Sequence, residues 1–328
     1  MSSRVFWICF SIVSFCLGVP SRGDVEAAPP VKNLRVTVLS TMLAGNPNKG
    51  IGEWGFSALI EVDGHRLLFD TGERPDTVLL NARELHIDLS NVKEVVLSHH
   101  HDDHVGGLLS LRNEYTKHNP AALSHVTLSR GAFWSRGPNK TGGDDNPLIG
   151  IRPIFEQTGG TFSEVDRPKE IFPGVWFLGP VPRTHAEQPT PKNDRVLTPA
   201  GWKPDDVPDD SALVFDTDKG LIVLTGCAHA GIINTLEYAQ QRIRPGAKIY
   251  EAGGGFHMFH ASDQQIAWTA ERMLALGVEY LHGSHCTGLD ALYRLRTLMN
   301  LPRDHAVVGA VGSWFDLEKG LHPLALAE

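Results

Sequence analysis

The run from Ser98 to His104 constrains the fold of this chain most, because its order, Ser-His-His-His-Asp-Asp-His, concentrates metal-binding side chains. Four of them, His99, His101, Asp103 and His104, follow the spacing His-x-His-x-Asp-His. Imidazole nitrogens and carboxylates bind Zn²⁺, Fe²⁺ or Mn²⁺, and two histidines one residue apart can chelate one ion while the next Asp-His pair faces another. A chance polyhistidine loop or a tag is the alternative, but tags lie at termini and lack interleaved aspartates. The run therefore predicts a site for two divalent ions.

The residues around this run predict a strand, a loop and then a helix. Val92–Ser98 is apolar and β-branched, as in a short buried strand, and Val105–Leu109 begins a helical pattern. Open α/β sheets place their binding sites at such strand ends. His100 and Asp102 alternate with the candidate ligands, so we expect them to point away from the ions. Asp102 is a candidate to orient a ligand imidazole.

With this histidine motif the chain resembles the metallo-β-lactamase-fold superfamily, from about Leu34 to about Asp316. Leu68–Gly72 is similar to the strand-end Asp motif of that family. Later motifs resemble one branch, the 7,8-dihydropterin-6-methyl-4-(β-D-ribofuranosyl)aminobenzene 5′-phosphate synthase group; they are Leu224–Ile232, Gly253–His257 and Gly283–Gly288. The resemblance implies an α/β fold, the metallo-β-lactamase-like αββα four-layer sandwich, and enzymatic activity.

The same resemblance implies which side chains surround each ion. His99, His101 and a later histidine are expected around one ion, and Asp103, His104 and a final histidine around the other. We choose His229 as the later histidine, because it follows the apolar strand expected at residues 220–225. We choose His285 as the final one, because it follows the strand-like run at residues 278–282. Zn²⁺ is the expected metal, with Mn²⁺ or Fe²⁺ as alternatives.

Three further residues are candidates for the site with roles left open. Cys227 occupies the position where many members of the family carry an Asp that bridges both ions; it is a thiolate ligand, a supporting group or a small buried residue. His257 follows the strand expected at residues 248–252 and a triple glycine, and either contacts substrate or acts as an acid. Asp70 is either a turn carboxylate after a strand or a support for the ligands.

The N-terminal residues predict a secretory signal peptide. An apolar stretch at Val5–Val19 is too short for a confident membrane span, and Val25–Ala27 supplies a small-residue cleavage pattern. Residues 1–27 are therefore expected to be removed and the protein secreted or periplasmic, without stable membrane insertion; an uncleaved anchor is the alternative.

Two cysteines remain after removal of the signal peptide, Cys227 and Cys286, each within two residues of a candidate ligand. We expect both thiols to line one cleft.

The mature chain is expected to form a single catalytic domain, residues 28–328, with a Pro-rich insertion around 130–210. Hydrophobic residues make up 41% of the chain, enough to bury a large core, and the motifs span nearly the whole length. Twelve of the 21 prolines fall between Gly137 and Asp210, so this stretch is expected to be mostly loop and to cover the cleft as a lid. Strands are expected at residues 34–40, 57–62, 65–69, 212–215 and 220–225, and helices at 78–85, 232–244 and 266–276.

The formal net charge of −8 argues against a nucleic-acid partner, so a small-molecule substrate is expected. Four cationic residues are candidates to contact a substrate that is anionic: Arg130, Arg136, Lys140 and Arg183.

The leading hypothesis is an exported hydrolase in which two metal ions activate water, Asp103 orients or deprotonates it, and a small ester, lactone or phosphodiester is cleaved. The first alternative is a transferase like the dihydropterin synthase group, which is less suited to an exported protein. The second is a non-catalytic metal-binding module. The sequence indicates no oligomeric state.

Overall fold

The computed structural model describes residues 29–137, 143–187 and 194–327. The predicted signal peptide at residues 1–27 and Lys140 lie outside the described residues. Within the described part of the chain, no helix is both long enough and apolar enough to cross a lipid bilayer.

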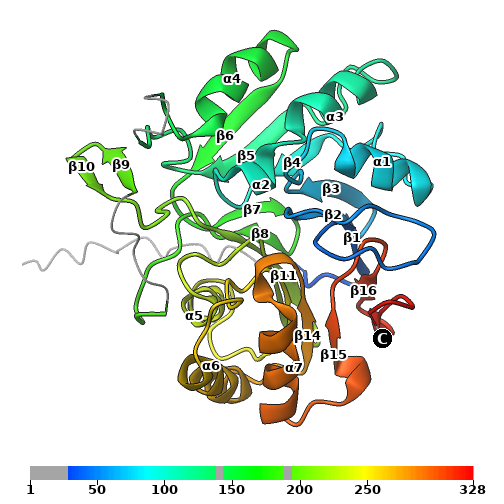
Figure 1. Ribbon diagram of the computed structural model, residues 1–328, viewed down its shortest axis with the longest axis vertical. Helices are drawn as coiled ribbons and strands as arrows, with labels where there is room; N and C mark the ends of the chain where they lie inside the picture. The colour runs from blue at the N-terminus through cyan, green and yellow to red at the C-terminus, as the bar shows by residue number, and fades with distance from the viewer. Residues whose placement is uncertain (1–28, 138–142, 188–193, 328) are drawn as a thin grey trace, which may run out of the picture.

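Two large sheets form the centre of the molecule (Figure 1). The first has eight strands in the order β17-β16-β1-β2-β3-β4-β5-β6, and the second has seven in the order β15-β14-β13-β12-β11-β8-β7. The strands of the first sheet are β1 (Leu34–Ser40), β2 (Ser57–Val62), β3 (His65–Phe69), β4 (Glu94–Val96), β5 (His125–Ser129), β6 (Thr161–Val165), β16 (Trp314–Asp316) and β17 (Gly320–His322). Those of the second are β7 (Lys169–Phe172), β8 (Val175–Phe177), β11 (Ala212–Thr217), β12 (Gly220–Thr225), β13 (Ile249–Gly254), β14 (Tyr280–Gly283) and β15 (Ala306–Val308).

Helices cover the outer face of each sheet (Figure 1). The helices on the first sheet are α1 (Thr77–Glu84), α3 (Leu108–Tyr115) and α4 (Pro147–Gln157), and the one-turn helix α2 (Asp102–Val105) lies at the end of β4. Those on the second sheet are α5 (Ile232–Arg242), α6 (Asp263–Ala275) and α7 (Leu289–Leu298). The layer order is helix, sheet, sheet, helix, which confirms the fold expected from the sequence.

The hairpin of β2 and β3 shows how the sequence pattern builds these layers. Asp63 and Gly64 connect the two strands with positive φ angles of 42° and 83°, as a tight hairpin turn requires. Side chains alternate between the two faces of a strand, so Ile60 packs between the sheets while Leu59 packs against the helices. Both faces of the hairpin are therefore buried.

The segment around residues 130–210 has more regular structure than its prolines indicate. It contains α4 and β6 to β8, and its strands complete both large sheets. Only the small hairpin of β9 (Arg195–Thr198) and β10 (Gly201–Pro204) stands apart from them (Figure 1). Much of the segment thus connects the two halves of the fold, because backbone pairing with strands distant in sequence overrides its local turn propensity.

Arg112 on α3 is a buried polar link in the first half of the molecule. Its guanidinium group donates hydrogen bonds to the carbonyl oxygens of Pro120, Ala122 and Thr158, and its Nε lies 3.0 Å from the hydroxyl of Thr158. These bonds join α3, the loop after it and the end of α4. Arg112 is only 2% exposed, so water could not replace its N–H groups as donors to these carbonyl oxygens if the side chain were removed.

We predict that Arg112→Met lowers the free energy of unfolding by about 2–4 kcal/mol, since the aliphatic chain is kept while several buried carbonyls lose their donor. Urea unfolding followed by circular dichroism measures this. Arg83→Met is the matched control, because Arg83 pairs with Glu114 on the exposed surface and its loss is expected to cost less than about 1 kcal/mol. Equal destabilisation by the two variants would contradict the prediction.

Candidate metal centre

The strand ends of both sheets bring the candidate ligands together. Strands β12, β13 and β14 are parallel, and their last residues, Thr225, Gly254 and Gly283, lie side by side, so their carboxyl ends meet at one edge of the second sheet. Strand β4 ends at the facing edge of the first sheet and leads directly into α2. All six ligands predicted from the sequence lie in the segments that follow these strands, two of them on α2; they are His99, His101, Asp103, His104, His229 and His285.

The first group of ligands consists of three imidazoles. Nε2 of His99 lies 3.0 Å from Nδ1 of His101, and the ring of His229 lies 4.8 Å and 4.7 Å from these two rings, centroid to centroid. Nε2 of His229 is buried and has no hydrogen-bond partner among the described residues. A buried nitrogen without a partner is unfavourable, and coordination of a cation would satisfy it.

The second group combines one carboxylate with two imidazoles. One oxygen of Asp103 lies 3.7 Å from Nε2 of His104, and the other lies 3.1 Å from Nε2 of His285. Asp103 and His104 belong to α2, a one-turn helix that the sequence did not predict; the helix expected from Val105–Leu109 is α3, which begins at Leu108. The ligand atoms of Asp103, His104 and His285 lie within 4.8 Å of one another.

Cys227 lies between the two groups. Its ligand atom is within 4.8 Å of those of Asp103, His104 and His285, and equally within 4.8 Å of those of the first group at His99 and His229. The cysteine is buried, and its Sγ is 3.1 Å from Nε2 of His104. This is the position in which a residue that bridges two ions would lie, so of the roles left open by the sequence the geometry favours that of a ligand.

Cys286 lies directly beside Cys227. The two sulfur atoms are 3.2 Å apart and both thiols are free. The two thiols thus lie together at the ligand groups, but both are buried and neither is among the lining residues of the cavity beside them. Burial raises the pKa of the Cys227 thiol well above its usual value.

Electrostatics prepare the imidazoles for coordination. Burial, together with the neighbouring histidines, lowers the pKa of His99 and His229 well below the usual value, and burial lowers that of His101 to about 3. These rings are therefore neutral, which is the form that binds metal. Burial would also lower the pKa of His104, but the carboxylates of Asp103 and Asp70 outweigh it and raise that pKa to about 9. A cation is therefore favoured at this end of the cluster.

The donor set fits two divalent ions. Imidazoles, a carboxylate and a thiolate are the ligands that Zn²⁺ and related borderline metals prefer, and Nε2 of His229, which has no partner among the described residues, points to a bound cation. His99, His101 and His229 would hold one ion, and Asp103, His104 and His285 the other.

Asp70 supports the ligands from beneath. Its fully buried carboxylate accepts hydrogen bonds from the backbone N–H and the hydroxyl of Ser98, each at 2.7 Å, and lies 2.7 Å from Nδ1 of His104. The Ser98 hydroxyl also contacts Nδ1 of His99 at 2.9 Å. These contacts leave the Nε2 atoms of both rings facing the metal position. These contacts favour the support role for Asp70, and no contact of the described residues gives Asp102 the orienting role considered for it.

Backbone strain gathers at the same place. Asp70, Ala228, His257 and His285 have φ angles of 56°, 54°, 51° and 48°, in the left-handed region that side chains other than glycine rarely adopt. Each residue of this kind costs on the order of 1 kcal/mol, and such strain clusters at functional sites.

A cavity of about 480 Å³ opens beside the first ligand group. His101, His229 and His257 line it next to the candidate metal position, and the ring of His257 lies 4.3 Å from that of His229. His257 therefore faces the cavity, where it is placed to contact substrate. Other lining residues are Arg136, Arg183, Asp194, Arg195, Asp205, Asp206, Val207, Phe259, His260 and Gln265. Of the cations considered from the sequence, Arg136 and Arg183 are thus at the cavity, whereas Arg130 is not among its lining residues.

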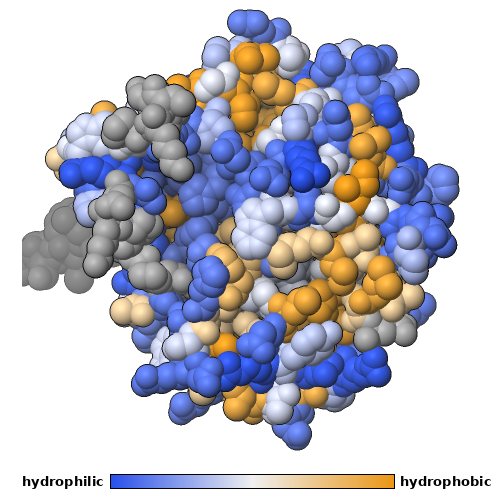
Figure 2. Space-filling view, viewed as in Figure 1, coloured by the Kyte–Doolittle hydropathy of each residue, from blue (hydrophilic) through white to orange (hydrophobic). Residues whose placement is uncertain are grey.

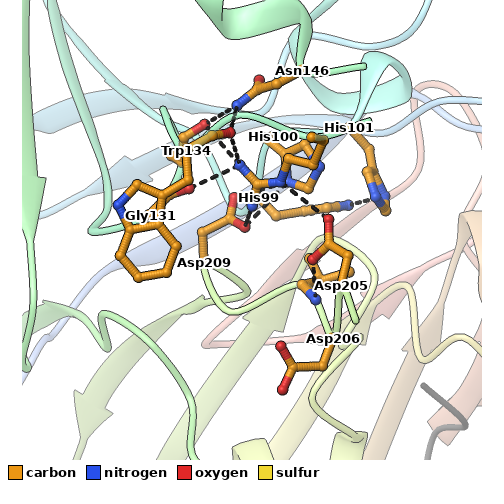
Figure 3. Close-up of polar contacts among 12 residues, drawn as sticks. His99, His100, His101, Gly131, Trp134, Asn146, Asp205, Asp206 and Asp209 are labelled. Atoms are coloured by element: carbon orange, nitrogen blue, oxygen red, sulfur yellow. Dashed lines mark hydrogen bonds and ion pairs between the residues drawn. The ribbon is translucent and has the colours of Figure 1, made fainter. Parts of the chain in front are cut away.

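A buried polar network joins the cavity wall to the histidine loop (Figure 3). Nδ1 of His100 lies 3.1 Å from both carboxylate oxygens of Asp209, so this ring turns away from the ligands as predicted. Arg136 donates to Asp209 at 2.6 Å and to Asp205 at 3.1 Å. Sequence reasoning missed Asp209, because 109 residues separate it from His100 and no local motif marks it.

Comparisons with known proteins agree with this geometry. A family model described as the metallo-beta-lactamase superfamily matches residues 55–285. The chain is 30% identical to the 7,8-dihydropterin-6-methyl-4-(beta-D-ribofuranosyl)-aminobenzene-5′-phosphate synthase of Methanocaldococcus jannaschii over 274 residues, which cover 80% of this chain and 90% of that protein. It is also 30% identical to an uncharacterized protein of the same organism over 264 residues, 78% of this chain and 93% of that protein. A solved structure described as a metal-dependent hydrolase of the beta-lactamase superfamily superimposes with a TM-score of 0.69 and 30% identity, covering 88% of this chain and 99% of the other.

We predict that the purified protein holds about two divalent ions per chain and that His101→Ala and His285→Ala each hold about one fewer, because each removes a ligand from a different group. Elemental analysis by mass spectrometry after dialysis measures this. His118→Ala is the control, because His118 is exposed and belongs to neither group. Unchanged metal content in both ligand variants would refute the assignment.

We predict that Asp70→Asn keeps the fold but weakens binding of the second ion about 10- to 100-fold, since the amide no longer favours the tautomer of His104 that presents Nε2. Competition with a chelating indicator measures the affinity. Asp88→Asn is the matched control, because Asp88 caps an exposed turn at Ser90. An equal change in the two variants would remove Asp70 from the site.

Proposed function

The chain belongs to the metallo-beta-lactamase superfamily and is an enzyme, and we propose that it catalyses a synthase reaction that joins a dihydropterin to a ribofuranosylaminobenzene 5′-phosphate. The proposal rests chiefly on the archaeal synthase, which is 30% identical over 80% of this chain. That relative favours the transferase alternative over the hydrolase that the sequence alone placed first.

The product named for the relative sets the chemical task. A pterin and an aminobenzene unit are joined through a methyl carbon, so one bond forms at that carbon, a leaving group departs from it, and the acceptor loses a proton. Two divalent ions held by the candidate ligands would supply Lewis-acid stabilisation of the negative charge on the departing group. No Ser or Cys nucleophile is needed.

The residues of the chain bind and orient the two reactants. The cavity beside His101 and His229 has room for a small molecule, and the arginines Arg183 and Arg195 at its wall are suited to a phosphate group. His257 lies against His229 and faces the cavity, so we assign to its ring the proton that the acceptor gives up.

A hydrolase acting on a small ester, lactone or phosphodiester is the second candidate, and a specific observation favours it. The solved structure with 30% identity and a TM-score of 0.69 is described as a metal-dependent hydrolase. The carboxylate of Asp103 is 16% exposed beside the ligands, where it is suited to orient a water molecule.

We also propose export, on the basis of the apolar stretch Val5–Val19. Export bears on the choice between the two activities, because assembly of a pterin cofactor is expected inside the cell. A secreted or periplasmic location would therefore favour the hydrolase.

We predict that the metal-loaded protein forms the joined product from a ribofuranosylaminobenzene 5′-phosphate and a dihydropterin that carries a leaving group on its 6-methyl carbon. Mass spectrometry of the reaction detects it. His101→Ala is expected to lower the rate at least about 100-fold through loss of a metal ligand, and His118→Ala to leave it unchanged.

Parallel assays with Zn²⁺, Mn²⁺ and Fe²⁺ on esters, lactones and phosphodiesters complete the experiment. Cleavage of one of these without formation of the joined product would replace the synthase with the hydrolase. Two bound ions with no turnover of any compound would instead favour the non-catalytic metal-binding module.

A further inference from the structure

Two large aromatic side chains stay exposed directly at the candidate metal centre. Trp54 is 40% exposed and Phe259 is 39% exposed. The ring of Trp54 lies 4.9 Å from that of His285 and 5.3 Å from that of Phe259, the latter in an edge-to-face arrangement. A single exposed aromatic is common on protein surfaces, but a pair that touches a metal ligand calls for an explanation.

The loop that carries Trp54 is held rigidly on both sides. The buried carboxylate of Glu53 accepts hydrogen bonds from the backbone N–H groups of residues 73 and 74, at 3.2 Å and 3.0 Å. On the other side, the backbone N–H of Phe56 donates to the carbonyl oxygen of Asp103 at 3.0 Å. Trp54 is therefore attached to a candidate ligand through a short, well-bonded stretch of backbone.

Phe259 is attached to the same centre from the second half of the fold. The backbone N–H groups of Met258 and Phe259 both donate to the carbonyl oxygen of Cys286, at 3.0 Å and 3.2 Å. Cys286 directly follows His285, a candidate ligand. The two rings and the ligands thus form one preorganised unit. Because the rings are already held in place, binding of another molecule to their exposed faces costs little further conformational entropy.

The surroundings of the pair differ on its two sides. Phe259 borders the polar cavity of about 480 Å³. On the other side of the ligand His285 lies a smaller hollow of about 190 Å³, with Met42, Leu43 and Leu289 in its lining. The face shown in Figure 2 has hydrophobic side chains gathered beside α7 and hydrophilic ones toward β9. A substrate with a flat apolar ring and a polar remainder matches this division.

We propose that Trp54 and Phe259 form an aromatic subsite that packs against a planar ring of the substrate at the metal centre. The inference rests on the proposed function, because the relative's product contains two such rings, a dihydropterin and an aminobenzene. Aromatic rings attract one another in offset and edge-to-face geometries beyond the area that they bury. The subsite would place the ring next to the ligands while the polar cavity takes the rest of the molecule.

Isothermal titration of the metal-loaded protein with 6-methylpterin and, separately, with 4-aminobenzoate tests the subsite and distinguishes the two rings. At least one probe is expected to bind. Trp54→Leu and Phe259→Leu are each expected to weaken its binding at least about fivefold, and Trp54→Phe to weaken it less than about threefold. Trp202→Leu is the matched control, because Trp202 is 47% exposed on β10 and, unlike Trp54, has no ring contact with a candidate ligand among the described residues.

The outcomes separate the subsite from the synthase proposal. Binding of neither probe, or equal binding by wild type and Trp54→Leu with unchanged metal content, overturns the subsite. Weakened binding in the two leucine variants without any joined product from the wild type supports the subsite and overturns the synthase. A joined product formed with an unchanged KM in Trp54→Leu supports the synthase and overturns the subsite.

Discussion

The buried carboxylate of Asp70 is the interaction on which the candidate metal centre depends. It lies at the end of β3 with no exposure to solvent and holds both Ser98 and His104. A buried carboxylate without partners would cost several kcal/mol, so its contacts must form together with the fold. Because they set the orientation of His104 and, through Ser98, of His99, one residue outside the ligand set determines where two imidazoles point.

The ligands also tie the two halves of the molecule together. His99, His101, Asp103 and His104 follow the first sheet, whereas His229 and His285 follow the second. Neutral rings packed this closely gain little from one another, and Nε2 of His229 is buried without a hydrogen-bond partner in the part of the chain that the structure describes, which is unfavourable. Divalent ions bound by these side chains would satisfy that nitrogen and link the two sheets. Metal binding and the stability of the sheet-to-sheet packing are therefore expected to be coupled.

Around this centre the structure separates chemistry from recognition. The ligands and Asp70 form a rigid base, the network of His100, Asp209 and Arg136 connects the base to the cavity wall, and the aromatic pair lies at its rim. A protein described as a synthase and one described as a hydrolase are each 30% identical to this chain, so family membership does not choose between the two activities. We therefore expect the wall and the rim to select the substrate.

The sequence by itself determined the family and the layered fold and predicted the candidate ligands, because these rest on local patterns: an alternating hairpin at residues 57–69, and histidines placed a few residues after apolar strands. It did not indicate that β6, β7 and β8, which lie in the segment at 130–210, form by pairing with strands distant in sequence. Only the tertiary structure decided that Cys227 lies between the two ligand groups, that Asp70 supports His104, and that Asp209 reaches His100 across 109 residues. Spacing along the chain carries no information about such contacts, because packing of the two sheets, and not local backbone geometry, brings these residues together.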